Sequence, residues 1–204
     1  MTTPRDLLIV AMDRASSSPV ERGDLSLALA GAEVIDLLGA QAVELDDGHL
    51  VPSARRAVAD PLLVEAASSL ARQAPYESLG DWLWRRGRGL SATYLAALEA
   101  EGQLARQRRR RWMLFRTKRV VLVDSPARSQ AADRWTADEP VLAALAAAIG
   151  IRDESTGDFP SVTDDEVATV LAAVTDALGE LADERQRRGR RLDEAAVNNV
   201  RRGY

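Results

Sequence analysis

The chain contains no cysteine, and its 204 residues include a single histidine, His49. The lack of cysteine excludes disulfide bonds, a thiol nucleophile and zinc–thiolate sites, and it is compatible with a reducing compartment. The sequence has no glycine-rich phosphate loop followed by Lys-Ser or Lys-Thr, and its acidic run 153–158 lacks the spacing of an EF-hand loop. Because no group of residues suggests an active site, we expect a protein that is not an enzyme, with no metal and no cofactor.

Long apolar segments are absent as well. The longest uncharged run, 140–151, has about half of the roughly 20 residues that a membrane-spanning helix requires. The first residues lack the basic region and the long apolar stretch of a secretory signal peptide. We therefore predict a cytoplasmic protein whose contact with a membrane is peripheral, at the inner face.

Positive charge is unevenly distributed along the chain. The formal net charge is −4, yet residues 85–119 contain eleven Lys and Arg residues against two glutamates, Glu99 and Glu101. This segment carries +9 and the remainder of the chain −13. Such a distribution orients a protein toward an anionic partner even when its total charge is negative.

The end of this basic segment also carries apolar side chains. Anionic head groups attract each nearby Lys or Arg by about 1 kcal/mol, and exposed aromatic rings enter the interfacial layer of a bilayer. We predict a membrane-contact hairpin formed by Arg108, Arg109, Arg110, Arg111, Trp112, Met113, Leu114, Phe115, Arg116, Lys118 and Arg119. The alternatives are an arginine-rich hairpin whose apolar residues pack on the core, and a surface for nucleic acid or a protein partner.

A second cluster of arginines follows two tryptophans in the sequence DWLWRRGRG. A guanidinium group can hold a phosphate through two parallel hydrogen bonds. We therefore predict a site for a lipid head group formed by Arg85, Arg86 and Arg88. The alternative is an ordinary helix end, because basic residues in a last turn complement the helix dipole and glycines stop helices.

Hydrophobic periodicity predicts a mostly α fold. The expected helices span 24–38, 60–74, 79–86, 91–100 and 140–150. A further helix is expected after Thr163 and Glu166, whose spacing is that of a capping box.

Two small β-hairpins complete the predicted fold. The first spans 43–52, around the turn Asp46-Asp47-Gly48, and the second spans about 103–123. The length and the apolar content of 46% suit a single globular helical domain, 1–204, around a buried apolar helix, for which 140–150 is the candidate. Residues from about 185 to 204 are expected to form a charged tail that is prone to fraying.

Six segments resemble, in the same order, motifs of the Golgi phosphoprotein 3 family, and of its bacterial, actinobacterial-type members in particular. They are Asp6–Asp13, Leu29–Leu37, Val43–Pro52, Asp60–Ala66, Leu98–Gly102 and Asp133–Trp135. The resemblance covers about residues 5–180. It implies a mostly helical domain with a basic pocket for phosphatidylinositol 4-phosphate and a hairpin that mediates self-association or touches the bilayer.

The four pocket positions of the family are only partly kept in this chain. One arginine falls on Arg88, but its partner one turn later falls on Ser91, another arginine falls on Ala30, and the tryptophan falls near Val20 or Glu21. Each lost charged donor to a phosphate costs about 1.5–3 kcal/mol. The resemblance thus implies a peripheral membrane protein that binds anionic phospholipid, with a possible membrane-protein client and a possible homo-oligomer through the second hairpin as partners.

Two other functions are compatible with parts of the sequence. Two helices followed by a basic hairpin are also the order of a winged helix that binds nucleic acid. The helix that would read the bases, 91–100, has no Arg, Lys, Asn or Gln and carries Glu99, so nucleic acid is the less favoured partner. Alternatively, Trp112–Phe115 could bury itself in a second subunit, which would make the chain an oligomerising interaction module.

Overall fold

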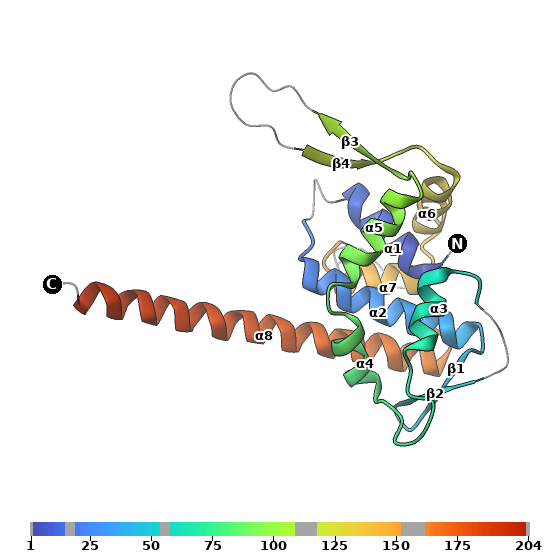
Figure 1. The fold of residues 1–204 in the computed structure, drawn as a ribbon, viewed down its shortest axis with the longest axis horizontal. Helices are drawn as coiled ribbons and strands as arrows, with labels where there is room; N and C mark the ends of the chain where they lie inside the picture. Colours follow the sequence, from blue (N-terminus) through green and yellow to red (C-terminus); the bar gives the residue numbers. More distant parts are fainter. Residues whose placement is uncertain (1, 15–18, 54–57, 109–117, 152–161, 203–204) are drawn as a thin grey trace.

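The computed structural model describes residues 2–14, 19–53, 58–108, 118–151 and 162–202. Helix α2 (Arg22–Gly39) runs through the middle of the molecule and is buried from Ser26 to Ile35. Its sequence consists mainly of small and apolar residues, which lets neighbouring helices approach on several sides. Around it pack α1 (Thr3–Arg14), α3 (Pro61–Ser68), α4 (Leu79–Arg86), α5 (Leu90–Ala100), α7 (Pro140–Ala148) and α8 (Asp165–Arg202) (Figure 1).

This arrangement confirms the predicted fold class, a helical domain with two small hairpins, and identifies its central helix. Helix α7 matches the predicted segment 140–150, but it buries mainly Leu142, Ala143, Leu145 and Ala146, whereas its other residues are half-buried. The prediction that 140–150 is the buried helix was therefore wrong. Helix α2 is the buried helix instead. It contacts α1, which precedes it in the chain, and the later helices α3, α4, α5, α7 and α8.

Both predicted hairpins are present. Strands β1 (Val43–Asp46) and β2 (His49–Pro52) pair antiparallel, and Asp47 and Gly48 between them have positive φ angles of 44° and 75°, as a two-residue hairpin turn requires. Strands β3 (Leu104–Arg108) and β4 (Lys118–Leu122) also pair antiparallel. The apolar tetrad 112–115 lies outside the described residues.

Local signals set the ends of the shorter helices. Asp60 caps α3 by accepting hydrogen bonds from the backbone N–H groups of Leu62 and Leu63. The helix ends at Ser68, six residues before the predicted end, because the hydroxyls of Ser68 and Ser69 donate to backbone carbonyls one turn back. Helix α6 (Pro126–Thr136) lies between β4 and α7.

Helix α8 is 38 residues long and projects from the domain (Figure 1). Its first turn is capped by Asp164, which accepts from the N–H groups of Glu166 and Val167, so the predicted capping by Thr163 was wrong. Val170 and Val174 lie fully buried in the domain. Beyond the domain the helix continues to Arg202, through the segment that was expected to be a tail, and Leu192 there is 71% exposed.

Two glycines test the packing of α8. A Cβ built on Gly31 in α2 would lie 2.3 Å from Cγ2 of Val174, whereas Gly179 in α8 has nothing within 4 Å. We expect Gly31→Ala to lower the free energy of unfolding in urea by about 1–3 kcal/mol through overpacking. Gly179→Ala should raise it by up to about 1 kcal/mol through helix propensity. Equal effects of the two substitutions would show that α2 and α8 are not closely packed.

Candidate functional site

The sequence Arg85-Arg86-Gly87-Arg88 ends α4, and the structure separates its three arginines. Arg85 lies on the surface, where Nε and Nη2 donate to the two carboxylate oxygens of Glu77, both at 2.6 Å. Its guanidinium also lies 5.1 Å from the ring centroid of Trp82 and donates to the carbonyl of Ser69. Most of the hydrogen-bonding capacity of Arg85 is therefore used within the protein.

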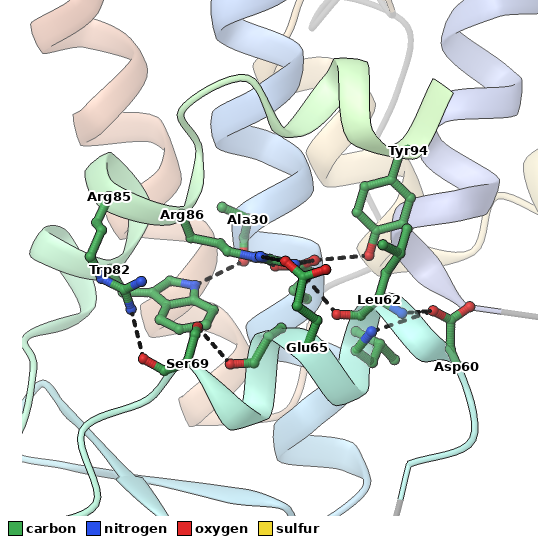
Figure 2. Close-up of polar contacts among 12 residues, drawn as sticks. Ala30, Asp60, Leu62, Glu65, Ser69, Trp82, Arg85, Arg86 and Tyr94 are labelled. Atoms are coloured by element: carbon green, nitrogen blue, oxygen red, sulfur yellow. Dashed lines mark hydrogen bonds and ion pairs between the residues drawn. The ribbon is translucent and has the colours of Figure 1, made fainter. Parts of the chain in front are cut away.

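Arg86 points into the domain (Figure 2). Its Nε and Nη2 donate to the carboxylate of Glu33 at 2.8 and 2.9 Å, and its Nη1 donates to Glu65 at 2.6 Å. Glu33 is fully buried and also accepts a hydrogen bond of 3.0 Å from the hydroxyl of Tyr94. One guanidinium thereby joins α2, α3, α4 and, through Tyr94, α5.

Burial and charge act in opposite directions on this network. Burial lowers the pKa of Arg86, but the hydrogen bonds and negative charges of Glu33 and Glu65 outweigh it, so the pKa is raised and the guanidinium stays charged. Burial, together with the Glu33 carboxylate, raises the pKa of Tyr94, which keeps its hydroxyl a donor. A phosphate could take Arg86 only by leaving Glu33 buried without its partner, which is costly.

Gly87 brings the end of α4 against α2. A Cβ at this position would lie 2.5 Å from the carbonyl oxygen of Leu83 and 3.2 Å from Leu27, so only glycine fits. Gly89 follows with a φ of 73°, in the left-handed region that favours glycine, and ends the turn before α5. Arg88 between the two glycines is exposed, and its side chain makes no ion pair with the described residues.

Arg88 lies at one side of a groove of about 390 Å³. The groove lies between the start of α2, the α4–α5 turn and α8, and its lining includes Arg22, Gly23, Leu27, Trp84, Ser91 and Leu181. Arg22 is exposed and, like Arg88, has no ion-pair partner in the described part of the chain. The lining of the groove therefore combines apolar residues with two arginines.

The start of α2 adds a further attraction for anions. The first N–H groups of a helix have no partner within it and carry the positive end of the helix dipole. The residue before α2, Glu21, makes no capping hydrogen bond with its side chain. Across the groove, Ser26 and Ser91 join α2 to α5 through a 2.9 Å hydrogen bond between their hydroxyls, and the N–H of Ser91 donates to Ser26 at 3.0 Å.

One of the two groove arginines, Arg88, is a predicted head-group residue. Of the three predicted head-group residues, Arg88 lines the groove, Arg85 pairs with Glu77 and Arg86 pairs with Glu33. Arg22 was not predicted, although its position two residues before the predicted helix start was a usable signal. In the membrane-contact hairpin, β3 and β4 are described, but residues 109–117 lie outside the described ranges, so their role stays a prediction.

These features define a helical domain with two small β-hairpins and a groove lined by two arginines. A family model of Golgi phosphoprotein 3 matches residues 4–202, so the chain belongs to that family, as its motifs predicted. No curated protein matches the chain. The groove contains both Arg88 and Ser91, which occupy pocket positions of the family by resemblance, whereas Ala30 is buried within α2. Among the described helices none is long and apolar enough to cross a membrane.

The structural role assigned to Arg86 can be tested by its removal. We expect Arg86→Gln to lower the free energy of unfolding by about 3–5 kcal/mol, because Glu33 would stay buried without its charged partner. Arg85→Gln is the matched control, and it should cost less than about 1 kcal/mol since its ion pair is at the surface. Urea denaturation measures both. Equal losses would contradict the assignment of Arg86 to the core.

Proposed function

We propose that the protein binds anionic phospholipid as a peripheral membrane protein and that the groove between Arg22 and Arg88 receives the phosphate of the head group. The observation that carries this proposal is the pair of arginines without ion-pair partners in the described chain, at an apolar groove beside the start of α2. Membership of the Golgi phosphoprotein 3 family, which is known for lipid binding, supports the same class of ligand.

The chemistry of the groove suits a phosphate group attached to a larger molecule. Two guanidinium groups supply charged donors, and the helix start favours negative charge. Trp84, Leu27 and Leu181 form an apolar wall against which a ring or a glycerol backbone can pack. By family resemblance, phosphatidylinositol 4-phosphate is the specific lipid that we propose.

The second hairpin is proposed as an additional membrane contact. Strand β3 follows α5, whose first residues border the groove, so one helix joins the two basic regions. Helix α5 has 11 residues, which corresponds to a length of about 16 Å. Self-association through this hairpin and an adaptor role toward a membrane protein, both implied by the family, stay further predictions.

Removal of both groove arginines tests the proposed site. We expect Arg22→Gln with Arg88→Gln to weaken binding to vesicles that contain phosphatidylinositol 4-phosphate by at least about tenfold, since each arginine near an anionic surface contributes about 1 kcal/mol and a direct hydrogen bond more. Vesicle flotation measures the binding. Arg72→Gln, an exposed arginine outside the groove, is the control and should have little effect. Unchanged binding of the double variant would rule out the groove.

Substitutions in the hairpin test the additional contact. We expect replacement of Arg108–Arg111 by serine to weaken binding to all anionic vesicles and to reduce its dependence on salt, because fewer charges then interact with the surface.

Trp112→Ser with Phe115→Ser should weaken binding at every salt concentration, since the apolar insertion is lost. If double-stranded DNA displaced the wild-type protein from vesicles and bound more tightly, nucleic acid would become the favoured partner.

A further inference from the structure

Helix α8 passes the groove at the point where it leaves the domain. Leu181 of α8 forms part of the groove wall, and Arg185 follows one turn later. The Nη1 atom of Arg185 lies 2.6 Å from Oδ1 of Asp24, in the first turn of α2. Arg185 therefore lies beside the groove rather than in its lining, on the helix that also supplies Leu181.

The second terminal nitrogen of Arg185 lies close to the groove lining. A Cβ built on Gly23 would lie 2.8 Å from Nη2 of Arg185 and 3.1 Å from Leu181. The lack of a side chain at Gly23 thus leaves room for the guanidinium to lie over the first turn of α2. Gly23 itself lines the groove, so Nη2 of Arg185 lies next to a lining residue, although Arg185 is not part of the lining.

Both a helix dipole and a carboxylate act on the guanidinium of Arg185. Its guanidinium lies at the positive end of the α2 dipole and near the groove that Arg22 and Arg88 line. Asp24 is its ion-pair partner among the described residues. The side chain of Arg185 is 38% exposed, so it can move toward a ligand without unpacking the core.

We propose that Arg185 is a third phosphate ligand of the groove and that Asp24 holds it beside the site. This inference rests on the proposed function. A guanidinium has five N–H donors, so Arg185 can keep one hydrogen bond to Asp24 and donate others to the ligand. Three arginines from three separate segments favour a phosphate monoester, which carries about −1.5 to −2 charge, over a phosphodiester with a single charge.

Removal of Arg185 alone would not test this proposal, because it would also expose the negative charge of Asp24 to the ligand. The experiment therefore uses Asp24→Asn as the reference protein. Two further variants add Arg185→Gln or Arg191→Gln to that background. Arg191 is an exposed arginine farther along α8 without an ion-pair partner in the described chain, so its removal changes the net charge equally.

Binding is measured by flotation with phosphatidylcholine vesicles that contain either phosphatidylinositol 4-phosphate or phosphatidylglycerol at equal surface charge. We expect Arg185→Gln to weaken binding to the monoester lipid by about tenfold, as for the loss of a charge-assisted hydrogen bond, and Arg191→Gln by less than about threefold. On phosphatidylglycerol the two losses should be similar and small. Circular dichroism and the urea midpoint establish that each variant is folded.

The outcomes separate this inference from the proposed function. If the wild-type protein needs Arg22 and Arg88 for binding but Arg185→Gln and Arg191→Gln weaken it equally on the monoester lipid, the groove stands and Arg185 is not a ligand. If the wild-type protein binds no anionic vesicle, or if its binding does not depend on Arg22 and Arg88, the proposed function fails and this inference fails with it.

Discussion

A carboxylate buried in the central helix determines how the groove is built. Glu33 is fully buried in α2, and a buried carboxylate is tolerated only when charged and neutral donors surround it. Arg86 and Tyr94 supply three hydrogen bonds to it, which fixes the end of α4 and the first half of α5 against α2. With Arg86 held inside, the next turn has little freedom, because Gly87 lies against Leu27 of α2 and against the carbonyl of Leu83 in α4. Arg88 then lies at the groove beside the start of α2.

Short-range signals explain which parts of the fold could be predicted. The span of α4 was predicted correctly because Ser78 caps it and a glycine follows it, and the first hairpin because Asp47 and Gly48 suit its turn. The separate roles of Arg85 and Arg86 could not be predicted in this way. Their partners are Glu77, eight residues before Arg85, and Glu33, 53 residues before Arg86. The direction of each side chain around the helix decides which of the two arginines enters the core.

Helix α8, at the other end of the chain, also makes a contact that could not be predicted from the sequence. A helix after Thr163 and Glu166 was predicted, but the charged residues toward its end gave no sign of contact with the domain. The ion pair of Arg185 with Asp24 joins positions 161 residues apart, and Glu184 pairs with Arg187 and Arg188 along the helix. Such i,i+3 and i,i+4 pairs support a helix without tertiary packing.

The negative net charge makes the position of the groove important for the proposed binding to a bilayer. In the proposed binding to an anionic bilayer, a protein of charge −4 gains nothing from random approach, so its basic side has to face the surface. The groove lies at the start of α5 and the basic hairpin follows its end, so both are carried by one rigid helix. Two weak contacts on a rigid spacer act together, because the first one raises the effective concentration of the second. In the proposed binding, the same two contacts then determine both the orientation of the protein at the bilayer and its affinity for the bilayer.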